Sequence, residues 1–157
     1  MRPLSNRQLE TQLLAEWLTL TVPPGRSKTH IRVGSEALLA QGLAPESPRA
    51  RALAVWSDWA DARVSWDSEL WIIEAAIVGT AGKYGQCLDY TLQYPESTDY
   101  KQFVGKLIVP VVLVAFEKPA VALRWLRYGV RTIIHTPKWA TKTLQDRIFY
   151  GSASIQT

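Results

Sequence analysis

The residues with the clearest capacity for chemistry are two carboxylates, Asp61 and Glu74. Each lies in a segment with strand-forming character, and the two segments meet at Asp67-Ser68. If that dipeptide is the turn of an antiparallel hairpin, Trp66 pairs with Glu69 and the same register sets Asp61 opposite Glu74. Directly opposed residues have Cβ atoms about 4.5–5.5 Å apart, which allows two carboxylates to share one hard divalent cation. The spacing therefore predicts a metal-binding carboxylate pair.

The polarity pattern supplies the two strands that hold these carboxylates. Residues 61–66 alternate between polar and apolar types, and residues 70–78 form an apolar, β-branched run. Side chains two positions apart on a strand share a face, so Glu74 and Ala76 point the same way. Ala76 therefore stands beside the predicted cation site, where alanine offers neither a charge nor a group that transfers protons.

A third set of polar residues lies on a helix predicted over residues 83–94. Lys83, Gln86 and Tyr90 fall at i, i+3 and i+7 and therefore occupy one helix face. Two carboxylates in a cross-strand pair repel each other unless a metal ion or a basic side chain neutralises them. Lys83 is one candidate for that basic side chain and Arg63 is another. The other interpretation of Lys83 is an ordinary surface lysine.

In this order, the motifs resemble the PD-(D/E)XK nuclease superfamily, which includes the restriction-endonuclease-like and RecB-like enzymes. Members have an aspartate late in one strand and a Glu-x-Lys motif in the next. The resemblance covers about residues 50–140. It makes Asp61 and Glu74 the catalytic carboxylates, with Mg²⁺ as the metal that they would hold. The lysine of the motif is replaced by Ala76, so the resemblance implies a nuclease fold without its usual lysine.

The resemblance extends to the helices. Gln86 and Tyr90 match the Gln-x-x-x-Tyr pattern that RecB-like members carry after the Glu-x-Lys strand, which implies contacts with the nucleic-acid backbone. Some members move the lysine to another element, and Lys83 is then the candidate in this chain. An acidic residue of the first helix often joins the metal site. Glu10 and Glu16 lie on the first predicted helix, where a solvated charge is the alternative interpretation.

The remaining elements predict an α/β fold in a single domain. A helix is predicted over residues 6–19, where a Ser-x-x-Gln capping box precedes leucines at helical spacing. A strand over 107–116, a helix beginning at Pro119 and a strand over 130–135 form a βαβ unit. We therefore expect a mixed central β-sheet flanked by helices, followed by a basic and aromatic tail over 137–157.

Three smaller predictions concern the sheet and the charge around it. Residues 29–33 alternate in polarity and predict a short edge strand. Pro110 lacks a backbone N–H, so we expect it at a bulge or at the start of its strand. Arg124, Arg127 and Arg131 give the βαβ unit a basic edge, and the first two are further candidate contacts for nucleic acid.

The composition narrows the class of protein. A chain of 157 residues that is 47% hydrophobic and 20% charged can form one domain with its own core. The net charge of +4 permits a polyanionic partner. The single cysteine excludes an intramolecular disulfide framework. We find no zinc-site spacing, no Gly-rich phosphate loop, no secretion signal and no apolar run long enough to span a bilayer.

Three functions follow from these observations. The first, favoured by Ala76, is a non-catalytic protein with a degenerate nuclease fold. It would act as an assembly or DNA-associated module, for example in the head–tail connector or neck of a phage virion. The second is a Mg²⁺-dependent DNA endo- or exonuclease in which Lys83 replaces the missing lysine. The third is a small protein-binding regulator.

The first function predicts no cofactor, and protein partners in a larger assembly or in a homo-oligomer, with DNA as a further partner. No membrane partner is expected. The chain is expected in the cytoplasm, or in the virion if it has a phage origin.

Overall fold

The computed structural model describes residues 4–34, 42–44, 46–49, 51–52 and 58–153 of the chain. Residues 154–157, the end of the predicted tail, lie outside the described residues. The helices and strands with their bounds are α1 (Asn6–Thr21), β1 (Ser27–Val33), β2 (Asp58–Ser65), β3 (Glu69–Val78), α4 (Ala81–Gln93), η1 (Tyr94–Glu96), η2 (Thr98–Phe103), β4 (Leu107–Phe116), α5 (Pro119–Leu126), β5 (Arg131–Ile134) and α6 (Lys138–Ala153).

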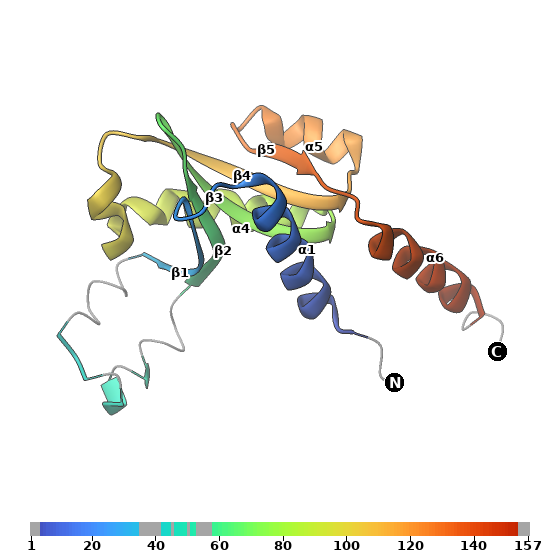
Figure 1. Cartoon of the computed structure of the whole chain (residues 1–157), viewed down its shortest axis with the longest axis horizontal. Helices are drawn as coiled ribbons and strands as arrows, with labels where there is room; N and C mark the ends of the chain where they lie inside the picture. Colours follow the sequence, from blue (N-terminus) through green and yellow to red (C-terminus); the bar gives the residue numbers. More distant parts are fainter. Residues whose placement is uncertain (1–3, 35–41, 45, 50, 53–57, 154–157) are drawn as a thin grey trace.

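One five-stranded sheet organises the described residues (Figure 1), and its strands lie in chain order from β1 to β5. β1–β2 and β2–β3 are antiparallel pairs, whereas β3–β4 and β4–β5 are parallel pairs. Because parallel neighbours need a crossover, α4 with the two 3₁₀ helices connects β3 to β4, and α5 connects β4 to β5. The α/β fold with a mixed sheet flanked by helices is therefore confirmed.

Helices cover both faces of the sheet. On β3, Ile73 and Ala75 belong to the apolar cluster that includes Trp17 of α1, whereas Ile72 and Ala76 point to the opposite face, which α4 covers. Trp17 is itself buried in the first of these clusters. Because β3 and β4 are buried on both faces, their sequences are nearly continuous apolar runs rather than alternating ones.

The helices begin and end at local signals in the sequence. Ser5 caps α1 in a capping box: its side chain accepts a hydrogen bond from the Gln8 N–H, and its own N–H donates to the Gln8 side chain. Pro119 is the first residue of α5, where a missing N–H costs nothing. Gly129 follows α5 with a φ of 79°, a conformation that favours glycine.

Most predicted strands are confirmed, and Pro110 is the exception. The strand predicted over 107–116 coincides with β4, and the edge strand predicted over 29–33 is part of β1. The predicted position of Pro110 is wrong, because this residue lies inside β4 and pairs with Ile72 of β3. The pairing of β4 with the described β5 starts at Val111, so at Pro110 the strand has its partner on the β3 side. A missing N–H is tolerated where a strand is paired on one side.

Candidate active site

The β2–β3 hairpin has the register predicted from its turn at Asp67-Ser68. The backbone N–H of Trp66 donates to the Glu69 carbonyl at 2.8 Å, and the ladder pairs that follow keep this register. The register sets Asp61 opposite Glu74. The register of the hairpin itself therefore brings the two carboxylates together, without a contribution from the helices.

Beyond the last ladder pair, the two carboxylates accept hydrogen bonds from backbone N–H groups in place of backbone carbonyls. The Asp61 N–H donates to Glu74 Oε1 at 3.2 Å, and the Ala75 N–H donates to Asp61 Oδ2 at 2.8 Å. Each side chain therefore binds the backbone of the opposite strand. This arrangement fixes the position of the pair where the β2–β3 ladder ends.

Glu74 is almost completely enclosed, with 2% of its surface exposed. Burial raises the pKa of Glu74 to about 8, and the charge of Asp61 acts in the same direction. The Asp61 backbone N–H and the charge of Lys83 act in the opposite direction. At neutral pH Glu74 therefore holds a proton, and a divalent cation would displace that proton on binding.

Asp61 lies where the alternation of side chains between the two sheet faces changes on both β1 and β2. Ala62 packs in the cluster beneath α1, whereas Ala60 packs in the cluster beneath the 3₁₀ helices. On β1, His30 has a positive φ of 56°, which is uncommon for a residue other than glycine. At this point Asp61 lines a cleft of about 320 Å³ against α1, together with His30 and Glu10.

Two helices each contribute a charged residue to the same region. The Nζ atom of Lys83, in the first turn of α4, lies 3.4 Å from Oε2 of Glu10 on α1. The charge of Lys83 also lowers the pKa of Glu74. The Lys83 side chain is therefore half-buried between α4 and α1, close enough to Glu74 for its charge to act on that carboxyl. Glu16, the other acidic candidate on α1, instead accepts a hydrogen bond from Trp139 of α6 at 2.8 Å.

The predicted polar face of α4 covers the carboxylate pair. Gln86 Nε2 donates to Tyr90 Oη at 2.7 Å. Burial raises the pKa of the Tyr90 hydroxyl, and nearby acidic charges that include Glu74 and Asp61 raise it further. Gln86 and Tyr90 therefore form a bonded pair of polar groups next to Asp61 and Glu74.

Ala76 is closed off by the same helix. It is 2% exposed and packs in an apolar cluster with Tyr84 and Cys87 of α4. Burial raises the pKa of the Cys87 thiol to about 12, which agrees with a packing role for this cysteine. The position that would carry the motif lysine is therefore part of the hydrophobic core.

We predict that Ala76→Lys lowers the free energy of unfolding by about 3 kcal/mol, because the longer side chain overpacks this cluster and buries an amine. Urea unfolding followed by circular dichroism measures the change. Ala81→Lys, at an exposed position at the start of α4, is the matched control and should behave like the wild type. An unchanged stability of Ala76→Lys would mean that α4 moves aside and that the lysine can reach Glu74.

Asp61 and Glu74 suit a divalent cation that takes few ligands from the protein. Mg²⁺ is commonly bound through one or two carboxylates, and water and substrate phosphates complete its coordination. Within the described residues, no group of three or more His, Cys, Asp or Glu side chains is arranged to hold an ion. The described residues therefore offer a cation two carboxylates, of which Asp61 lines the cleft and Glu74 is enclosed behind it.

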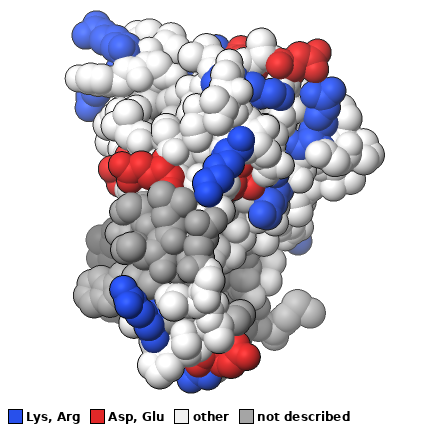
Figure 2. Space-filling model, turned by 90° about the vertical axis from the view of Figure 1, so that its left-hand side faces the viewer, with Lys and Arg blue, Asp and Glu red and all other residues white. Residues whose placement is uncertain are grey.

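Arg124 and Arg127, the other predicted nucleic-acid contacts, lie in a different part of the fold. Both are exposed at the end of α5, which packs beside β5, while Asp61 is on β2. Figure 2 shows basic side chains at several separate positions on one face of the molecule, with acidic side chains among them. The described structure does not bring these two arginines to the carboxylates.

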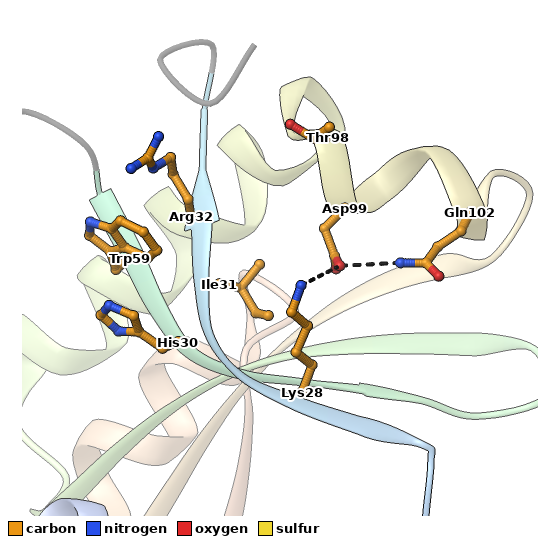
Figure 3. A pocket seen from close by; sticks show the side chains of 8 residues that line it. All are labelled: Lys28, His30, Ile31, Arg32, Trp59, Thr98, Asp99 and Gln102. Atoms are coloured by element: carbon orange, nitrogen blue, oxygen red, sulfur yellow. Dashed lines mark hydrogen bonds and ion pairs between the residues drawn. The ribbon is translucent and has the colours of Figure 1, made fainter. Parts of the chain in front are cut away.

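Sequence reasoning missed a stack of side chains on the edge of the sheet. The His30 ring lies parallel to the Trp59 ring, with centroids 4.2 Å apart, and the Arg32 guanidinium lies 4.7 Å from the Trp59 centroid. In Figure 3 the indole lies between the other two groups. The available signal was the alternation of residues 29–33, because Lys28, His30 and Arg32 occupy every second position of an edge strand.

Comparison with protein-family models, with curated proteins and with solved structures finds no match to this chain. In the described part of the chain, no helix combines the length and the hydropathy needed to cross a membrane.

Proposed function

We propose that this chain is a Mg²⁺-dependent nuclease with a PD-(D/E)XK-like fold, in which Asp61 and Glu74 hold the metal and Lys83 replaces the lysine absent at Ala76. The position of Lys83 carries this proposal: it reaches Glu10 from α4 and influences the buried carboxylate. Ala76 favoured a non-catalytic protein on the sequence alone. A lysine supplied by another element removes that objection.

Each residue has a chemical role in phosphodiester hydrolysis. When bound, Mg²⁺ polarises the phosphate and lowers the pKa of a coordinated water. As the water oxygen bonds to phosphorus and the bond to the leaving sugar oxygen breaks, negative charge develops that Lys83 offsets. The attacking water gives up one proton to the solvent, and the leaving sugar oxygen takes one up from it, so that the step balances. Gln86 and Tyr90 provide hydrogen-bonding groups for the sugar–phosphate backbone of the DNA strand next to the cleaved bond.

A cation titration tests the metal site without relying on activity. We expect Mn²⁺ or Mg²⁺ at pH 8.5 to raise the melting temperature of the wild type. A cation at a hundred times its dissociation constant adds about 2.7 kcal/mol to the stability. Asp61→Asn should abolish this increase, because it removes one of the two charged ligands.

Asp67→Asn is the matched control, since Asp67 is an exposed aspartate in the turn of the same hairpin, and it should retain the increase. Cleavage of single- and double-stranded DNA is measured with the same samples. A wild type that neither responds to the cation nor cleaves DNA would contradict the proposal.

The second candidate function is the non-catalytic assembly or DNA-associated module. The supporting observation is a set of exposed apolar side chains on α4, β4, α5 and the turn after α5, because such residues are common at protein interfaces. They are Leu92, Leu107, Leu123, Leu126 and Tyr128. The partners would be other proteins of a larger assembly, such as a phage virion, or further copies of this chain. A stable oligomer in light scattering, without cleavage or a cation response, would favour this candidate.

A further inference from the structure

A cleft of about 450 Å³ lies between the edge strand β1 and η2 (Figure 3). It is lined by Lys28, His30 and Arg32 of β1, by Trp59 of β2 and by Asp99 of η2. In Figure 3 the side chains of His30, Trp59 and Arg32 lie on one side of β1, and that of Lys28 lies on the other side, towards Asp99. The volume is within the range of small-molecule and nucleotide pockets, roughly 300–1,000 Å³. The cleft thus combines basic groups with flat ring systems.

The acidic group of the cleft is already neutralised. Asp99 accepts hydrogen bonds from Arg63 Nε at 2.8 Å and from Tyr94 Oη at 2.6 Å, and Arg63 is buried. Lys28 lies 3.7 Å from Asp99, but its side chain is 60% exposed. Lys28 and Arg32 therefore face this cleft as positive groups, and its carboxylate, Asp99, is already paired with the buried Arg63. The local excess of positive charge favours an anionic ligand.

Arg32 has unused hydrogen-bonding capacity. Among the described residues its guanidinium forms no hydrogen bond and no ion pair, and its Nε atom is buried without a partner. A buried donor without an acceptor costs about 1–3 kcal/mol. The other N–H groups of this guanidinium, which also have no partner among the described residues, suit phosphate oxygens, because guanidinium groups bind phosphate well.

The aromatic stack is held in place before any ligand arrives. Trp59 packs between His30 and Arg32, so its ring has little freedom to lose on binding. His30 is exposed and has the left-handed backbone conformation, which costs an L-residue roughly 1–2 kcal/mol. This conformation accompanies the stacking of the imidazole on the indole, and the exposed imidazole is available to a further ring.

We propose that the stack of His30, Trp59 and Arg32 binds an unpaired base of single-stranded nucleic acid, with Lys28 and Arg32 contacting the adjacent phosphates. Only an unpaired base can offer its face to a protein ring, because the bases of a duplex are stacked on each other. The inference deepens the proposed nuclease function by naming single strands as its substrate class, and it rests on that function for the reaction.

The position of His30 connects the base platform to the carboxylates. His30 lines the cleft beside η2 and also the cleft that contains Asp61 and Glu10. A strand whose base stacks on His30 therefore directs a neighbouring phosphodiester towards Asp61. Base binding would take place on one side of His30, and phosphodiester hydrolysis on the other.

Fluorescence anisotropy tests the platform with a fluorescein-labelled oligothymidylate roughly 15 nucleotides long, near the upper site size of one single-strand-binding fold. The full chain is used in EDTA. We expect the wild type to bind this strand more tightly than a duplex of the same length. His30→Asn and Trp59→Ala should each weaken binding roughly tenfold, since stacking on one aromatic side chain is worth about 1–3 kcal/mol per base.

His30→Asn keeps the fold testable, because asparagine tolerates a positive φ but has no ring. Tyr128→Ala, which removes an exposed aromatic side chain after α5, is the matched control and should bind like the wild type. Unchanged binding by His30→Asn, or equal affinity for duplex and single strand, would overturn the inference. Single-strand binding without a cation response would support the platform and refute the metal site, whereas a cation response without single-strand binding would do the reverse.

Discussion

Lys83→Met is expected to slow Mg²⁺-dependent cleavage by about 10²–10⁴-fold, the usual effect of losing a group that transfers protons or stabilises charge in a transition state. Methionine has nearly the length of lysine and lacks its charge. Lys83 belongs to the first turn of α4 and reaches Glu10 across the carboxylate site. The measurement is the single-turnover cleavage rate of a labelled DNA strand at saturating Mg²⁺.

Lys142→Met provides the matched control, because Lys142 is an exposed lysine of α6. It should cleave at the wild-type rate. The melting temperature of Lys83→Met shows whether the loss of the Glu10 contact disturbs the fold. If a folded Lys83→Met variant cleaved at the wild-type rate, Lys83 could not be the replacement lysine.

Glu74→Gln is expected to gain stability relative to the wild type as the pH rises, measured in EDTA. The free energy of unfolding of the variant minus that of the wild type should be about 2–3 kcal/mol larger at pH 9 than at pH 6. Folding raises the pKa of Glu74 from 4.5 to about 8. Between these values the folded protein holds a proton that the unfolded chain has lost. The stability from this group is therefore complete below pH 4.5 and is lost as the pH rises through 8.

Glutamine avoids this loss because its side chain stays neutral, and its amide oxygen can still accept the hydrogen bond from the Asp61 N–H. Urea unfolding at a series of pH values gives both stabilities. Glu96→Gln, at an exposed glutamate of η1, should follow the wild type. Parallel pH profiles for the wild type and Glu74→Gln would show that Glu74 is ionised in the folded protein at neutral pH.

The hairpin could be predicted because its information is local. The alternation of residues 61–66, the apolar run that follows and one turn dipeptide fix the register that sets Asp61 opposite Glu74. The βαβ unit was readable for the same reason, since proline and glycine mark the ends of its helix.

The rest of the site depends on packing between distant segments. Whether Lys83 reaches the carboxylates or solvent is decided by how α1 and α4 meet at the end of the β2–β3 ladder, where Glu10 lies. The stack on Trp59 depends on a left-handed backbone conformation at His30. The sequence does not predict this conformation, because glycine is its usual signal and this position holds histidine. The position of Pro110 was predicted wrongly, because a proline inside β4 is tolerated only where the next strand, β5, does not pair with it. The sequence of β4 does not show where that pairing begins.

The interlocked hairpin has a consequence for the order of events during folding. Asp61 and Glu74 come together through contacts between residues close in sequence, and such contacts form early and quickly. The enclosure of Glu74 requires α4 to pack on the sheet, which is a later step that joins more distant residues. If the hairpin forms first, Glu74 takes up a proton or a cation when α4 packs over it. The rate of that docking step should then depend on the acidity of the solution.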